Sequence, residues 1–154
     1  MPTQTQSQLE RILDEGYASA EPWHGPNLRQ AIAQVPEALA YWRPAPERHS
    51  IAEIALHHAF YVHSVRGRIA AAPEPFPVTA EWVALPGSSG PDWKNIQTLL
   101  AEQQARLAAL AGDLAAGRAT SKLSQEETFG TILGITSHAI YHAAQIQLLK
   151  RLHG

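Results

Sequence analysis

The spacing of apolar residues in the second half of the chain constrains the fold most strongly. One set alternates at intervals of three and four residues: Trp93, Ile96, Leu100, Gln103, Leu107, Leu110 and Leu114. This spacing puts the set on one side of an α-helix and is typical of helices packed in a bundle. We therefore predict a long helix that begins at Pro91-Asp92 and ends near Gly117.

Two further long helices are predicted from capping boxes, in which a serine hydroxyl accepts from a helical N–H and a glutamate reaches back to the serine N–H. Ser50 and Glu53 form the first box, and its helix is predicted to last until Pro73. Ser124 and Glu127 form the second, before a helix predicted over about residues 126–152. The predicted core positions of that last helix are Thr128, Thr131, Ile135, His138, His142, Gln145, Leu149 and Leu152.

The remaining segments complete an all-α prediction for one domain over residues 1–154. Apolar residues at helical spacing predict a helix over about residues 7–17 and a second segment from residue 23 that Pro36 interrupts. Residues 36–49 are predicted to form turns with one short helix, and alternation of the kind that marks strands is hard to find. The connection over residues 73–90 is long for a compact domain, so we expect it to be functional or to span the bundle.

Composition excludes several classes of protein. The net charge is −2 and the basic residues are scattered, which does not fit a nucleic-acid-binding protein. No apolar run approaches the roughly 20 residues of a membrane span, and the polar start lacks the features of a secretory signal. Without cysteine, thiolate ligands and a cysteine nucleophile are excluded as well. We expect a soluble cytoplasmic protein.

His138 and His142 are the most informative pair for function. Four residues apart on a helix, they lie one turn apart on one face, so both rings can hold one metal ion. Chance alone supplies roughly 0.4 such pairs among eight histidines, so the context must decide. Ala139 stands where zinc proteases have their catalytic glutamate, which argues against a protease. Unpaired polar groups in a core cost about 1–3 kcal/mol each, so these rings need metal, water or each other.

A second histidine pair, His57 and His58, lies on the helix that Ser50 begins. A lone buried histidine is more often satisfied by a backbone carbonyl than by a metal. Two pairs on two long helices make a metal site more plausible, because bundle interiors are where facing helices build such sites.

Two motifs in this order resemble the DinB-like superfamily. The first runs from Ser50 to His57, as Ser-Ile-x-Glu-Ile-x-x-His, and the second from His138 to Ile146, as His-x-x-Tyr-His-x-x-Gln-Ile. Members are largely bacterial, cytoplasmic and often dimeric four-helix bundles that are regarded as metalloenzymes. The resemblance therefore implies a four-helix bundle with long crossover connections, a homodimer, and a site of three histidines, here His57, His138 and His142.

The same resemblance implies a divalent metal ion, either Zn, Ni, Fe or Mn, with open positions for water or a small-molecule substrate. Two positions compete for the first ligand. The spacing from Ser50 in the family motif selects His57, whereas the apolar spacing of the helix selects His58, and we favour His57. Candidate residues around the metal are Tyr61 and Tyr141 as proton donors and Gln145 as a partner of a ligand or of bound water.

Several residues are assigned less specific roles. Trp82 and Trp93 are candidates for a pocket wall, although core packing is the commoner role for tryptophan. Glu53 is expected to be engaged by its capping box and so to be a poor general base. The other histidines are expected at the surface or in a second layer: His24, His49, His63 and His153.

Three functions are consistent with these features of the sequence. The first is a metal-dependent enzyme, either a transferase acting on a low-molecular-weight thiol or a hydrolase. The second is a non-catalytic, stress-related bundle that binds metal or a small ligand. The third is a plain helical scaffold with a polar layer of histidines and water.

Overall fold

The computed structural model describes residues 6–85 and 92–154, and all regular structure in these residues is helical. The elements are α1 (Gln8–Gly16), α2 (Leu28–Ile32), α3 (Glu37–Ala40), α4 (Ile51–Ile69), α5 (Trp93–Ala115) and α6 (Gln125–His153). The all-α prediction is confirmed. Pro91, the predicted start of one helix, lies outside the described residues, and Asp92 caps α5 by accepting from Asn95 N at 2.7 Å.

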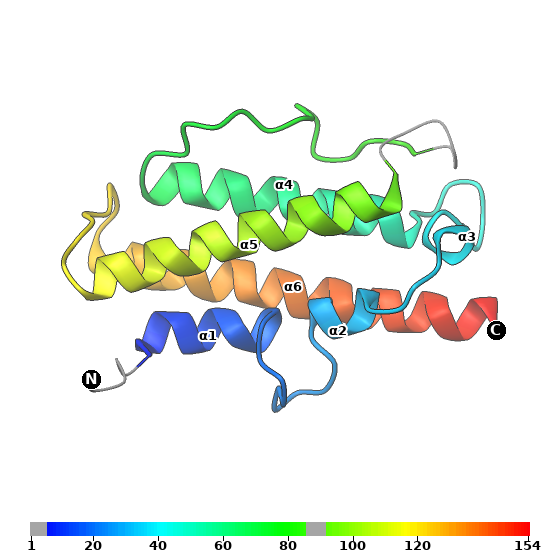
Figure 1. Cartoon of the computed structure of the whole chain (residues 1–154), viewed down its shortest axis with the longest axis horizontal. Helices are drawn as coiled ribbons and strands as arrows, with labels where there is room; N and C mark the ends of the chain where they lie inside the picture. The colour runs from blue at the N-terminus through cyan, green and yellow to red at the C-terminus, as the bar shows by residue number, and fades with distance from the viewer. Residues whose placement is uncertain (1–5, 86–91) are drawn as a thin grey trace.

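The long helix α4 packs on both α5 and α6, and α1 and α2 follow one another along another side of α6 (Figure 1). The fourth helix of the bundle is therefore assembled from two short pieces. Both pieces pack on α6, and α1 also packs on α5. Among the described residues, no helix has the length and apolarity that a membrane crossing requires.

Both predicted capping boxes are present. Ser50 Oγ accepts from Glu53 N at 3.2 Å and Ser50 N donates to Glu53 Oε1 at 2.9 Å, and the box of Ser124 and Glu127 has the same form. The prediction that the helix after Ser50 lasts until Pro73 is wrong by four residues. The chain leaves the helix in an extended conformation at Ala70, so α4 ends at Ile69.

The buried residues form two apolar clusters, one toward each end of the bundle. On α5 the first cluster reaches Leu100 and the second begins at Leu107, with the buried Gln103 between them. On α6 the boundary falls between Ile135 and Ala139. Gln103 and the buried histidines His57, His58 and His142 lie near this boundary, in a middle layer of the bundle.

The predicted core face of α6 is partly wrong. Thr128, Ile135, His142 and Leu149 are buried, but Leu152 is 59% exposed and Thr131, His138 and Gln145 are only half-buried. The buried face is instead completed by Ile132, Ala139 and Ile146. A strict repeat of 3.5 residues drifts around a helix of 3.6 residues per turn, so it leaves the contact face over a helix this long. His138 therefore lies at the edge of the buried face.

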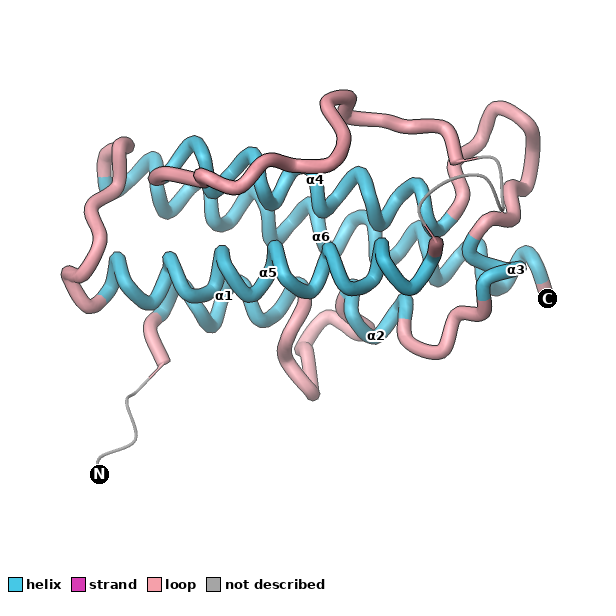
Figure 2. Tube along the Cα trace, turned by 45° about the horizontal axis from the view of Figure 1, so that its top comes forward, coloured by secondary structure: helices cyan, strands magenta, loops and turns pink. Residues whose placement is uncertain are grey.

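The connection from α4 to α5 runs back along the outside of α4 over residues 70–85 (Figures 1 and 2). It thus spans the bundle, as predicted, while residues 86–91 of the predicted connection lie outside the described residues. Glu74 anchors it early, since its carboxylate pairs with Arg66 and Arg106 and its carbonyl accepts from His63 Nε2 at 2.8 Å. Leu85 N donates to Glu53 Oε2 at 3.4 Å near the other end.

Candidate metal centre

Three histidines converge in the middle layer of the bundle. His57 comes from α4, and His138 and His142 come from successive turns of α6. One ring nitrogen from each residue lies within 4.8 Å of the other two, an arrangement that could hold a metal ion. His57 and His142 are only 5% and 4% exposed, whereas His138 is half-buried. The group is therefore largely shielded from water and reachable from the side of His138.

The closest pair of nitrogens has the separation that one ion would require. His138 Nε2 and His142 Nε2 lie 3.2 Å apart. Two nitrogens bound to one zinc ion at about 2.0–2.1 Å in tetrahedral geometry are separated by about 3.3 Å. The two α6 rings are thus already placed as they would be around a shared metal.

In the two buried histidines of the group, His57 and His142, the Nδ1 atom has a hydrogen-bond acceptor. His57 Nδ1 lies 2.9 Å from the carbonyl oxygen of Glu81, and His142 Nδ1 lies 2.7 Å from Gln145 Oε1. Both oxygens can only accept, so each ring carries its hydrogen on Nδ1 and keeps a lone pair on Nε2. Partners of this kind fix the tautomer and orientation of metal-binding imidazoles. Gln145 is thus placed to orient the ring of His142.

His138 is held in the same way, but by another histidine. His138 Nδ1 and His58 Nδ1 lie 2.7 Å apart, so one of the two nitrogens carries the hydrogen that joins them. A metal ion on His138 Nε2 needs a lone pair there, which moves the ring hydrogen to Nδ1 and makes His138 the donor. His58 then carries its own hydrogen on Nε2. That buried atom has no hydrogen-bond partner within the described residues.

These contacts separate the two rival positions on α4. His57 lies in the group of three, while His58 is fully buried behind His138. The structure thus places His57 in the group that could hold a metal ion and His58 in hydrogen-bond contact with His138.

Electrostatics keep the rings neutral. Burial, reinforced by the positive charge that His142 and His57 would carry, lowers the pKa of His138 from 6.5 to about 4. Burial likewise lowers the pKa of His142 to about 4, although Gln145 opposes the shift, and burial lowers the pKa of His57. Metal ions bind neutral imidazole, so the lone pairs are available throughout the physiological pH range.

Substitution of His58 tests its role directly. Asparagine retains an acceptor near the position of Nδ1, whereas leucine fills a similar volume without one. Loss of a partner of a metal ligand typically weakens metal binding 10- to 100-fold. We therefore expect His58→Leu to weaken Zn²⁺ binding by this factor and His58→Asn to restore most of it, as measured by competition with a chelator. Equal affinity in wild type and His58→Leu, with both metal-free proteins folded by circular dichroism, would show that His58 does not orient His138.

An aromatic wall closes one side of the centre. The Trp82 ring lies between two imidazoles in parallel stacking, with centroids 3.7 Å from His57 and 3.6 Å from His49. Trp82 therefore lines the site, as proposed for it. Trp93 is buried elsewhere and donates from Nε1 to the carbonyl of Val35 at 2.7 Å, so its role is core packing. His49 is exposed, as expected, but belongs to this wall.

The two candidate tyrosines lie on different sides of the centre. The Tyr61 ring centroid is 5.0 Å from those of both His57 and His138, and burial and a hydrogen bond to the Glu81 carboxylate raise the pKa of Tyr61. Tyr141 is 62% exposed, with its ring 5.2 Å from that of His142. Tyr61 thus contacts two rings of the group of three, whereas Tyr141 contacts one ring from an exposed position. Glu81 was missed by sequence reasoning, because an exposed acidic residue in a loop carries no signal of its contacts.

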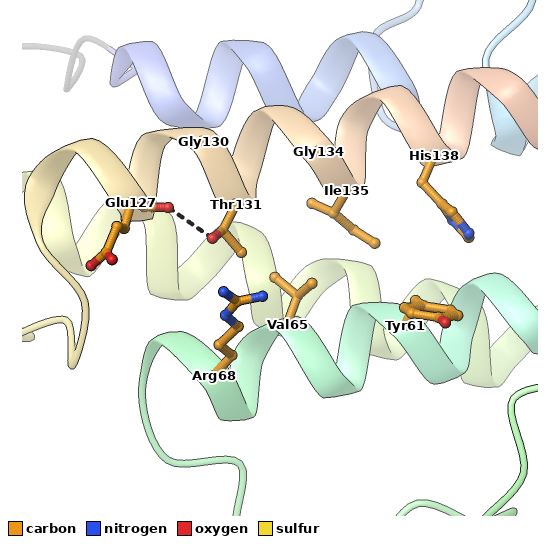
Figure 3. Close-up of a pocket in the computed structure, with 9 residues that line it drawn as sticks. All are labelled: Tyr61, Val65, Arg68, Glu127, Gly130, Thr131, Gly134, Ile135 and His138. Atoms are coloured by element: carbon orange, nitrogen blue, oxygen red, sulfur yellow. Dashed lines mark hydrogen bonds between the residues drawn. The ribbon is translucent and has the colours of Figure 1, made fainter.

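Two cavities flank the centre. One of about 420 Å³ lies between α4 and α6 and is lined by Tyr61 and His138 (Figure 3). The other, of about 600 Å³, lies beside His142 and is bordered by Trp82 and Tyr141. Glu53 is poorly placed to act as a general base, as expected. Its two carboxylate oxygens accept hydrogen bonds from Ser50 N and Arg43 Nη2, each at 2.9 Å.

One protein-family model matches most of the chain. The model described as the DinB superfamily matches residues 23–146, a stretch that includes all three converging histidines. Neither a curated protein nor a solved structure matches the chain.

Proposed function

The chain belongs to the DinB superfamily, and from this premise we propose that it is a metal-dependent enzyme whose metal ligands are His57, His138 and His142. The observation that carries the proposal is the set of Nδ1 partners, since Glu81, Gln145 and His58 engage the Nδ1 atoms of three rings that converge closely enough to hold one ion. Three neutral imidazoles suit Zn, Ni, Fe or Mn in the divalent state.

The proposed reaction acts on a small molecule, either by transfer to a low-molecular-weight thiol or by hydrolysis. When bound, a divalent ion polarises a carbonyl, lowers the pKa of water or stabilises a thiolate, and a set of three protein ligands leaves a position for one of these. The chain itself supplies a cavity on either side of the centre through which a small molecule can approach.

The surrounding residues support this chemistry in distinct ways. Trp82 covers the face of His57 and keeps water from that side. Tyr61 is protonated at neutral pH, as an ordinary tyrosine is, and its raised pKa keeps it so at higher pH; its hydroxyl is therefore available as a proton donor beside His138. Gln145 holds His142 in one tautomer.

The alternative is a non-catalytic protein that binds metal or a small ligand. The observation in its favour is that the group of three, as found in the described residues, contains no carboxylate that could act as a general base. Both carboxylate oxygens of Glu53 are engaged in other hydrogen bonds. The homodimer and the cytoplasmic location remain predictions.

Metal analysis separates these functions. We expect purified protein to bind about one equivalent of Co²⁺ or Zn²⁺ per chain, and the visible spectrum of the Co²⁺ form to gain a thiolate band when 2-mercaptoethanol is added. Metal binding without any response to the thiol or to azide would favour the non-catalytic alternative. A chain that binds no metal would be the plain helical scaffold.

A further inference from the structure

The cavity between α4 and α6, which we call the α4–α6 groove, is lined by different kinds of side chain along its length. His138 and Tyr61 stand at one end, Val65 and Ile135 line the middle, and Arg68 stands at the other end (Figure 3). A molecule lying in the groove would therefore meet the metal ligands first, then apolar side chains, and finally a cation.

Arg68 is available to a ligand. In Figure 3 its guanidinium points across the groove toward Thr131, while the carboxylate of Glu127 is turned away from it. None of the hydrogen bonds or ion pairs between described residues involves Arg68. Glu127 is occupied by its capping box, where its Oε2 accepts from Ser124 N at 3.0 Å. Within the described residues Arg68 therefore makes no direct ion pair, although the Glu127 carboxylate, which lines the same end of the groove, lies near enough to attract it.

Two glycines keep the α6 side of the groove open. Gly130 and Gly134 lie one turn apart in the helix and line the cavity, although glycine costs about 1 kcal/mol relative to alanine inside a helix. A Cβ atom at either position would meet no atom within 4 Å. At Gly16, by contrast, a Cβ would lie 3.2 Å from the carbonyl oxygen of Thr136. Close packing within the chain therefore explains Gly16, but not Gly130 or Gly134, where a side chain would occupy the groove.

We propose that the α4–α6 groove binds a small organic anion, with its acidic group on Arg68 and its reactive end at the metal beside His138. The assignment rests on the proposed function, because the metal defines the reactive end. Seven residues separate Tyr61 from Arg68 on α4, which corresponds to about 10 Å along the helix. The apolar body of the ligand should therefore be about 10 Å long.

A series of thiols with terminal carboxylates tests the groove without a catalytic assay. Thiolates bind divalent transition metals, and 8-mercaptooctanoate spans about the length of the groove. We expect Co²⁺-loaded protein to bind it about 2- to 5-fold more tightly than 8-mercapto-1-octanol, as measured from the thiolate band, since a largely exposed ion pair contributes modestly. With the shorter 3-mercaptopropionate and 3-mercapto-1-propanol, acid and alcohol should bind alike.

Two matched variants complete the test. Arg68→Gln should remove the preference for the acid while it leaves binding of the alcohol unchanged. Gly134→Leu should block both long probes, and Gly134→Ala, which adds only a methyl group in open space, should block neither. A preference for the acid that is absent, or that survives Arg68→Gln, would overturn the inference and leave the proposed function intact. Failure to bind Co²⁺ before any thiol is added would instead refute the proposed function, and the inference with it.

Discussion

Replacing His57 with alanine is expected to weaken binding of Zn²⁺ or Co²⁺ by at least about 100-fold. The free energy of binding of structural zinc is about 10–16 kcal/mol over four ligands, so one ligand contributes about 3 kcal/mol, or two orders of magnitude in Kd. His138→Ala and His142→Ala should have effects of the same size, because the ring nitrogens of all three residues converge. Elemental analysis after gel filtration and competition with a chelator measure the loss.

His49 supplies the matched control for this experiment. Its ring stacks on the face of Trp82 opposite to His57, so His49→Ala removes an imidazole from the same aromatic stack without touching the group of three. We expect this variant to retain one metal ion per chain with nearly unchanged affinity. The choice of His57 would be wrong if His57→Ala kept its metal and a variant of His58 lost all of it.

Acid is expected to destabilise the metal-free protein between about pH 6.5 and pH 4. The pKa values of His138 and His142 fall from 6.5 to about 4 on folding, so in this window the unfolded chain binds more protons than the folded chain. The free energy of unfolding therefore decreases as the pH falls through the window and levels off below it. We expect a loss on the order of 2 kcal/mol for the pair, discounted because His138 is only half-buried.

Urea denaturation of the metal-free protein at several pH values measures this effect. In the double variant His138→Asn/His142→Asn the decrease between pH 6.5 and pH 4 should be smaller, because two of the four histidine rings of the middle layer are gone. His57 and His58, whose pKa values burial also lowers, should account for the decrease that remains. In the wild type, added Zn²⁺ should raise stability at pH 7 and lose its effect toward pH 4, since protons compete for the same nitrogens. A wild-type stability that stays constant over this range would contradict the neutral state assigned to the two rings.

Much of the fold follows from local features of the sequence. Capping boxes at Ser50 and Ser124 place the starts of α4 and α6, because their hydrogen bonds join residues only three apart. The apolar spacing from Trp93 to Leu107 places α5 and its buried side. The apolar spacing predicted the buried side less well on α6, where the buried face follows contacts with α1, α2 and α4 and Leu152 extends beyond them.

The pairing of His138 with His142 is also local, since helical geometry alone brings residues four apart together. The sequence by itself therefore determined an all-helical chain, the starts of its long helices and two of the three converging histidines. It did not decide between His57 and His58, because neighbouring residues on a helix point about 100° apart. That decision depends on the rotation of α4 against α5 and α6.

Tertiary structure also decided what surrounds the histidines. Glu81 and Trp82 reach His57 from a connection 24 residues farther along the chain, and His58 reaches His138 across 80 residues. Such contacts form only when the bundle packs, since no local pattern specifies which distant group will face a ring. The physical reason is the sequence distance over which each interaction acts. Hydrogen bonds between near neighbours determine the helices, whereas packing of side chains that are distant in sequence adds His57 and its partners to the pair on α6.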